Sequence, residues 1–146
     1  MVTRARDPGP LAREIEHTAD LGLEVEAPTL PLVFERAGLA VLGLMIDLTA
    51  IEPRQQAEVS VEGETLEDVL HDWLQALLLR LQVGQFAACE ITVTHVDPQG
   101  VRGIVAGERV DPSRHRLYTE IKGVTYHRLA VGPRGEGWWA RVIVDV

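Results

Sequence analysis

The sequence is poor in cysteine and lacks long apolar runs. Cys89 is its one cysteine among 146 residues, so no disulfide can form within the chain. Because its neighbours favour a strand, Cys89 is expected to be a buried, unreactive thiol, which favours a cytoplasmic location. No apolar stretch approaches the roughly 20 residues that cross a bilayer, and residues 1–12 lack the apolar core of a secretory signal. No membrane association is therefore expected.

Motifs that identify common enzyme classes are also missing. The glycines of residues 132–137 precede a strand instead of a helix, so they do not form a phosphate-binding loop. The chain has no Gly-x-Ser-x-Gly sequence and no cysteine–histidine spacing of a zinc site. Positive charge is scarce: 14 basic and 22 acidic residues give a net charge of −8, which argues against direct, high-affinity nucleic-acid binding. Carboxylates remain as the main candidates for chemistry.

Length and composition fit one globular domain preceded by a short leader. With 46% hydrophobic and 25% charged residues, a chain of this length buries roughly 70% of its unfolded surface on folding. Residues 1–12 contain Asp7-Pro8-Gly9-Pro10, offer little to bury and are expected to form a flexible leader. Residues 13–146 are expected to fold as the domain.

Hydrophobic periodicity predicts two helices among strands. Thr29 is expected to cap a helix of about 17 residues, and Thr65 with Asp68 to begin a second, strongly amphipathic helix. His71 and Asp72 lie outside the apolar stripe of that second helix and are expected to face solvent, with recognition by a partner as the alternative. Alternation predicts strands at residues 14–26 (interrupted at 18–20), 55–62, 88–97, 101–110, 118–130 and 138–146. The order ββαβαββββ indicates an α+β fold: a single-domain sandwich of mostly antiparallel strands packed with two helices.

Two features of the strand at 101–110 and the connection after it carry structural predictions. Gly103 and Gly107 are expected to mark bulges or positions where another backbone approaches closely. The connection holds a basic group, expected to be a solvated loop, with contact to an acidic partner as the alternative. This group consists of Arg109, Arg114, His115 and Arg116.

The residues best suited to chemistry lie at strand ends. The stretch 120–127 alternates like a strand yet is polar on both faces, with Lys122 on one and His127 on the other. Asp20 lies at a strand junction, where sites are often built, and Asp145 lies near the end of the last strand. The alternative for Asp20 is a carboxylate that only accepts hydrogen bonds within a turn.

If the first and last strands are neighbours, Asp20 and Asp145 can converge. Two carboxylates about 4 Å apart repel by roughly 4 kcal/mol at an effective dielectric constant of 20. Such a pair must hold a proton or a cation. Oxygen ligands favour a hard ion such as Ca²⁺ or Mg²⁺, and main-chain carbonyls near the end of the last strand can complete the shell.

Motifs spread along the chain resemble the archease family. The resemblance runs from about residue 13 to residue 146 and departs at Leu21 and Gly123, where isoleucine and alanine are expected. The matching residues are His17–Gly22, Phe34, Ala37, His71–Leu74, Gly107, Glu108, Glu120–His127 and Trp139–Val146.

The resemblance implies a protein cofactor of the GTP-dependent RNA-splicing ligase, which joins RNA ends in tRNA splicing and RNA repair. Family members are known to promote guanylylation and multiple turnover of the ligase, and they are not known to catalyse ligation themselves. The resemblance also implies a divalent metal ion, calcium above all, held by Asp20, Asp145 and the carbonyl oxygen of Val146. His17, Lys122 and His127 become candidates for contact with the ligase or with its active-site metal. The alternatives are a hydrogen-bonded strand histidine for His127 and a surface cation for Lys122.

Two other functions stay open at this point. A metal-dependent hydrolase would hold an ion with Asp20 and Asp145 and use His127 as general base. A chaperone-like module would bind proteins through exposed apolar surface. Trp138 and Trp139 are the candidates for that surface, because neighbouring strand residues point to opposite faces.

Overall fold

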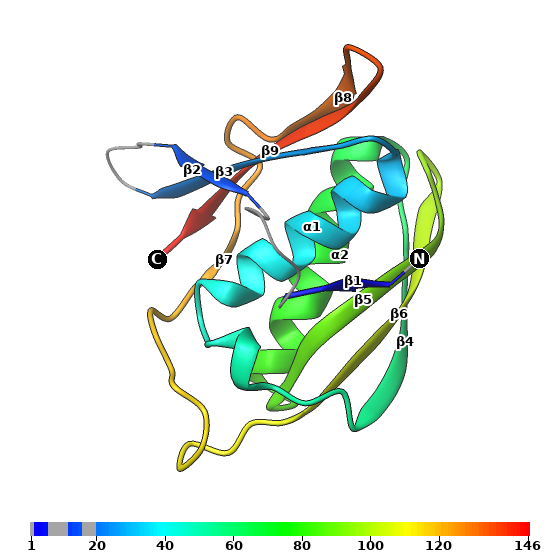
Figure 1. Ribbon diagram of the computed structural model, residues 1–146. Coiled ribbons are helices and arrows are strands. Elements are labelled where there is room, and N and C mark those ends of the chain that lie inside the picture. Colours follow the sequence, from blue (N-terminus) through cyan, green and yellow to red (C-terminus); the bar gives the residue numbers. More distant parts are fainter. Residues whose placement is uncertain (1, 6–11, 16–19) are drawn as a thin grey trace.

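Two antiparallel sheets and two helices make up the computed structural model, which describes residues 2–5, 12–15 and 20–146 (Figure 1). The helices are α1 (Leu30–Gly43) and α2 (Leu66–Gln82), with a short 3-10 helix, η1, at Leu48–Ala50. The strands are β1 (Thr3–Arg4), β2 (Arg13–Ile15), β3 (Leu21–Ala27), β4 (Gln55–Glu62), β5 (Phe86–Asp97), β6 (Gly100–Arg109), β7 (Gly123–Val124), β8 (Ala130–Arg134) and β9 (Gly137–Asp145). One sheet has the order β1-β5-β6-β4, and the other has the order β2-β3-β9-β7, with β8 also paired to β9. The predicted α+β fold is confirmed.

The predicted helix starts are confirmed. The Thr29 hydroxyl accepts a hydrogen bond from the Leu32 N–H at 3.3 Å, and the Thr65 hydroxyl accepts one from the Asp68 N–H at 3.1 Å. These bonds satisfy main-chain N–H groups of the first turn, which have no carbonyl partner within the helix. Helix α1 ends at Gly43 and is shorter than predicted. No helix in the described part of the chain is long and apolar enough to cross a membrane.

Both helices contact strands of both sheets, and this explains their burial. Helix α1 packs against β5 on one side and against β3 and β9 on the other, while α2 packs against β4 and β5 and also against β7 and β8. Because α1 is covered from two sides, its buried residues extend beyond a single stripe and include Phe34 and Leu39. The Trp73 indole on α2 is fully buried and donates a hydrogen bond to the Phe34 carbonyl at 3.1 Å.

The predicted role of the β6 glycines is also confirmed. A Cβ on Gly103 would lie 2.7 Å from the Trp73 ring, and a Cβ on Gly107 would lie 1.8 Å from the Ala87 carbonyl oxygen. The register between β5 and β6 shifts near Ala88 and again near Val93, so the bulges lie opposite these glycines. Close approach of the main chain therefore requires glycine on β6.

Part of the expected leader is a strand, so that prediction is wrong for residues 3 and 4. Thr3 pairs with Ile91, and its hydroxyl donates to the carboxylate of Glu35, a buried acid on α1. The other Glu35 oxygen accepts from the Val93 N–H on β5 at 2.9 Å. Residue 1 and residues 6–11 of the expected leader lie outside the described residues.

The single strand expected at 118–130 is also wrong. Residues 120–122 are not in a strand, only Gly123 and Val124 of that range pair with β9 before Ala130, and Arg128 has a φ of 55°. A left-handed residue of this kind turns the chain, which ends the alternation. The glycine-rich turn is confirmed as the β8–β9 hairpin, with Gly135 at φ 59°.

Candidate functional site

The paired residues of β3 and β9 end one position short of the two predicted acids, Asp20 and Asp145. Leu21 pairs with Val144 and Gly22 with Ile143. Continued by one residue, this antiparallel register would set Asp20 across from Asp145. Directly opposed residues have Cβ atoms about 4.5–5.5 Å apart, so carboxylates at these positions are within reach of one ion. We call Asp20, Asp145 and the carbonyl of Val146 the acidic edge.

The chain after residue 121 runs alongside the acidic edge. The Lys122 N–H donates to the Asp145 carbonyl oxygen at 2.7 Å, and Gly123 pairs with Asp145. Thr125 then bonds the Ile143 carbonyl twice, through its N–H at 3.0 Å and its hydroxyl at 3.1 Å. In Figure 1 the end of β9 lies beside β7. The strongly patterned stretch 120–127 is thus attached to the strand that carries Asp145.

Among the predicted site residues, Lys122 and Asp145 are joined directly, through their main chains. Asp20 lies one residue before the paired part of β3, and His127 lies further along the loop that follows β7. His127 is exposed and follows Thr125, whose hydroxyl accepts a hydrogen bond from the His127 N–H at 3.2 Å. Val146 is 41% exposed. His17 lies outside the described residues.

The donor set of the acidic edge suits a hard divalent cation. Two carboxylates and a main-chain carbonyl are all oxygen ligands, which calcium prefers. No group of three or more histidine, cysteine, aspartate or glutamate side chains suited to a metal occurs within residues 2–5, 12–15 and 20–146. Main-chain oxygens or water would therefore complete the coordination shell of an ion held here.

His71, expected to face solvent, instead bonds the segment beside the acidic edge. Its Nε2 lies 2.9 Å from the Val124 carbonyl oxygen, its Nδ1 lies 2.9 Å from the Asp72 carboxylate, and 15% of its side chain is exposed. The Tyr126 ring stacks on it with centroids 4.0 Å apart. Partial burial, followed by the Asp72 charge, raises the pKa of Tyr126. The prediction that His71 faces solvent is wrong, because helical periodicity indicates only which apolar side chains are buried.

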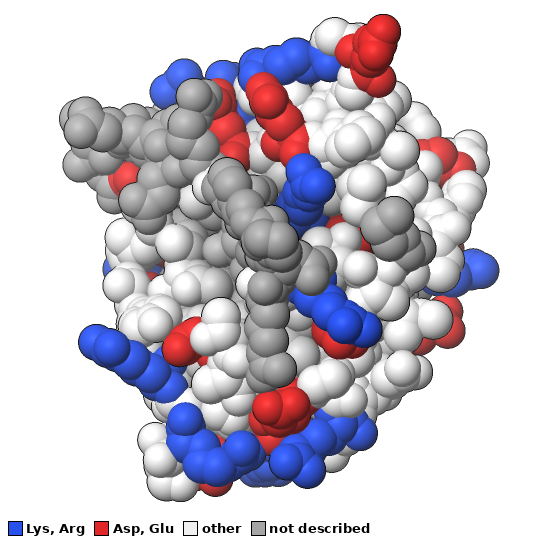
Figure 2. Space-filling model, viewed as in Figure 1, with Lys and Arg blue, Asp and Glu red and all other residues white. Residues whose placement is uncertain are grey.

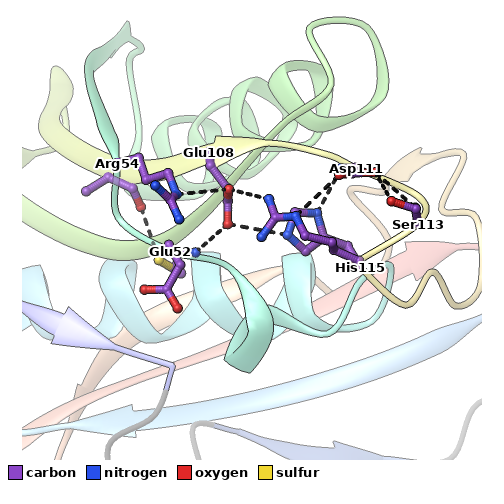
Figure 3. Close-up of polar contacts among 9 residues, drawn as sticks. Glu52, Arg54, Glu108, Asp111, Ser113 and His115 are labelled. Carbon is purple, nitrogen blue, oxygen red and sulfur yellow. Dashed lines mark hydrogen bonds and ion pairs between the residues drawn. The ribbon is translucent and has the colours of Figure 1, made fainter.

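A second polar cluster surrounds Glu108, a buried acid at the end of β6 (Figure 3). Its carboxylate accepts from the Glu52 N–H at 2.7 Å and from Arg114 at 2.7 Å, and Arg54 lies 3.5 Å away. His115 Nε2 lies 3.3 Å from the same carboxylate. The cluster ties the loop before β4 to the connection after β6.

The His115 Nδ1 accepts a hydrogen bond from the Asp111 N–H at 2.8 Å, and its Nε2 faces the Glu108 carboxylate at 3.3 Å. Its side chain is fully buried, so the solvated-loop prediction is wrong for this residue. The prediction is correct for Arg109 and Arg116, which are exposed. Figure 2 shows basic side chains gathered at the lower end of the molecule, where this connection lies.

The Glu108 cluster should make the stability of the fold depend on pH in the acid range. The main-chain N–H of Glu52, assisted by Arg114, holds the pKa of Glu108 below its ordinary value of 4.5 although burial acts to raise it. A lowered folded-state pKa contributes stability that is present above pH 4.5 and is lost as pH falls through the folded value. Glu108→Gln should lower the free energy of unfolding at pH 7 by about 2 kcal/mol and flatten its dependence on pH below 4.5.

Urea unfolding at several pH values measures both effects of Glu108→Gln. Glu58→Gln is the control, because Glu58 forms an ion pair with Arg102 at 3.8 Å in which both side chains are about two-thirds exposed. Equal pH dependence in the wild type and in the Glu108 variant would contradict the role given to this carboxylate.

Trp138 and Trp139 do not provide the exposed apolar surface considered above. Trp138 packs against the core. The Trp139 ring is covered by the guanidinium groups of Arg134 and Arg141, whose carbons lie 4.3 and 5.3 Å from its centre. The exposed large hydrophobic residues include Leu117 and Tyr118 instead.

Known proteins similar to this chain share one family description. Residues 13–146 match the Archease protein family (MTH1598/TM1083). A protein archease of Methanopyrus kandleri is 37% identical over 136 residues, which cover 91% of this chain and 97% of that protein. The solution structure of Methanobacterium thermoautotrophicum protein 1598 superposes with a TM-score of 0.78 at 26% identity, covering 94% of this chain and 100% of that one. A crystal structure of an archease, possible chaperone, from Thermotoga maritima has a TM-score of 0.63 at 23% identity, covers 99% of each chain and shows the shared fold alone.

Proposed function

The chain belongs to the archease family, and from that premise we propose that it activates a GTP-dependent RNA-splicing ligase in tRNA splicing and RNA repair. In this proposal it is an accessory protein that promotes guanylylation and multiple turnover of the ligase, and it is not itself an enzyme. It acts in the cytoplasm, contacts the ligase through the acidic edge, and does not depend on direct nucleic-acid binding.

One observation supports this proposal above the others: Leu21 pairs with Val144, and the β3–β9 register continued by one residue would set Asp20 across from Asp145. Two opposed carboxylates are held at low cost only when they share a proton or a cation. Oxygen donors favour a hard ion such as Ca²⁺ or Mg²⁺, and the family resemblance points to calcium. When bound, it would neutralise the pair and could take an oxygen of the partner as a further ligand.

Three residues would extend the contact with the ligase. The Lys122 main chain is hydrogen-bonded to the main chain of Asp145, and its side chain is exposed, so a cation near the acidic edge is available to the ligase. His127 follows on the same exposed loop. His17 precedes Asp20 by three residues.

Metal removal tests the proposal first on the isolated protein. Dialysis against a chelator should lower its thermal midpoint, and added Ca²⁺ should restore it, because an ion that binds only the folded state at 100 times its Kd adds about 2.7 kcal/mol. Mg²⁺ and Mn²⁺ at matched concentrations compare the ions. A midpoint that is insensitive to all three ions would exclude the metal site.

The ligase assay then tests the activity itself. Guanylylation of a purified RNA-splicing ligase is measured with and without this protein, at controlled Ca²⁺, Mg²⁺ and Mn²⁺. The expected result is faster guanylylation that saturates with added protein. No change in the rate at any ion concentration would contradict the proposal, and phosphoester hydrolysis by this protein alone would favour the hydrolase instead.

A chaperone-like activity is the second candidate, favoured by the exposed pair Leu117 and Tyr118, which are 55% and 48% exposed. They line a cavity of about 310 Å³ together with Met45, Leu81 and Val110. The Thermotoga maritima relative is described as a possible chaperone. Suppression of aggregation of unrelated unfolded proteins, independent of metal and lost in Leu117→Ser, would support this function.

A further inference from the structure

We propose that His71, Gln75 and Gln82 on α2 are positioning residues, which hold the segment 121–124 and thereby fix Lys122 against the strand that carries Asp145. The inference deepens the proposed function, and its ligase readout rests on that function. The positions i, i+4 and i+11 fall on one face of a helix. The apolar Leu78 lies on the same face and is buried, so the three polar side chains flank the core at the point where α2 meets the segment.

Each of these residues bonds a main-chain group of the segment. The Gln75 Oε1 accepts from the Val124 N–H at 3.0 Å, and the His71 Nε2 donates to the Val124 carbonyl at 2.9 Å. The Gln82 amide donates to the Ile121 carbonyl. Main-chain groups that are partly buried need such hydrogen-bond partners. Leaving one of them unpaired would lower the stability of the fold by about as much as several exposed contacts raise it.

The opposite side of the same segment is bonded to β9. The Lys122 N–H donates to the Asp145 carbonyl at 2.7 Å, and Val124 pairs with Val144. The segment is therefore hydrogen-bonded to α2 on one side and to β9 on the other, although only Gly123 and Val124 form a strand. Loss of the α2 bonds would free it on one side and loosen Lys122 with it.

The surroundings of His71 fix its ring. Nε2 faces a carbonyl oxygen, so this nitrogen carries a proton, and Nδ1 faces the Asp72 carboxylate at 2.9 Å. Tyr126 covers the ring at an interplanar angle of 14°. A ring held at both nitrogens and on one face has a single orientation, which suits a positioning role.

The same helix supplies a matched case without this role. Arg80 donates to the Glu58 carbonyl at 3.2 Å, so it also joins α2 to a strand main chain, but in the other sheet and away from the acidic edge. A general effect of helix–strand bonding would appear in Arg80 and Gln75 variants alike. A positioning effect would appear only in the Gln75 variant.

Amide hydrogen exchange tests the inference on the free protein. Gln75→Leu removes the acceptor, and the exchange rates of the Val124 and Lys122 amides, relative to the core amide of Val105, should rise about tenfold. Gln75→Glu keeps an acceptor oxygen and should restore slow exchange. Arg80→Leu should leave both amides unchanged. Unchanged exchange at Lys122 in Gln75→Leu, or an equal rise in Arg80→Leu, would overturn the proposal.

A ligase titration gives the functional readout. The concentration of Gln75→Leu that half-saturates guanylylation should rise about tenfold, whereas Arg80→Leu should match the wild type. Failure of the wild type to stimulate the ligase would refute the proposed function alone, because hydrogen exchange involves no ligase. Wild-type half-saturation by a Gln75→Leu protein that shows fast exchange at Lys122 would overturn the link between positioning and ligase contact.

Discussion

Asp145→Asn and Asp20→Asn are each expected to reduce ligase stimulation to the rate of the ligase alone while the fold stays intact. Asparagine keeps the size of the side chain and removes one of two opposed charges at the end of the β3–β9 register. With only one carboxylate left, the edge loses most of its attraction for a divalent ion. Guanylylation and Ca²⁺ titration of each variant measure the two losses separately.

In the absence of metal, these two variants should not be less stable than the wild type. Without metal, removal of one charge relieves carboxylate repulsion, so the free energy of unfolding should be unchanged or higher. With Ca²⁺, the wild type should gain stability and the variants should not. Glu136→Gln, in the exposed turn of the β8–β9 hairpin, is the control that removes an acid elsewhere. Wild-type stimulation by both aspartate variants would refute the metal-bound edge.

The elements that could be predicted from the sequence are those set by local chemistry. Thr29 and Thr65 cap their helices because a hydroxyl satisfies main-chain donors three residues on. Strand β4 alternates because one of its faces is exposed, and its bounds match the prediction. The convergence of Asp20 and Asp145 was a hypothesis that needed the first and last long strands to be neighbours, and β3 and β9 are neighbours.

The elements that were missed depend on partners far away in the sequence. Thr3 lies in a strand because it pairs with Ile91 and its hydroxyl donates to Glu35. No pattern within residues 1–12 indicates these two contacts. His71 bonds Val124, and periodicity along α2 contains no information on that carbonyl. Residues 120–122 alternate as a strand does, yet their main chain is held in part by Gln82 instead of a neighbouring strand.

The sequence before Glu108 indicates that this acid is buried, although the alternation of polar and apolar residues does not. Residues 103–107 are small or apolar on both faces, which is typical of a strand covered on both sides. An acid that ends such a strand must meet buried partners. Those partners, Arg54, Arg114 and His115, come from two loops, so their identity required the structure.

Gly107→Ala is expected to destabilise the fold by about 3 kcal/mol or more, at the upper end of overpacking effects. The added Cβ would lie 1.8 Å from the Ala87 carbonyl oxygen and 2.9 Å from the Ala88 Cα. Both atoms belong to the main chain of β5, which pairs with β6 along its length, so neither can move without breaking the ladder. A loss of this size is a large part of the roughly 5–15 kcal/mol that holds a domain folded.

Gly132→Ala is the matched control for this substitution. Gly132 also lies in a strand, β8, but a Cβ there meets nothing within 4 Å. Replacing an unstrained glycine reduces the entropy of the unfolded chain, so this variant should be unchanged or slightly more stable. Urea unfolding of the two variants should therefore separate them by several kilocalories per mole. Equal stability would mean that β5 and β6 accommodate a side chain at Gly107, and the requirement for glycine there would be wrong.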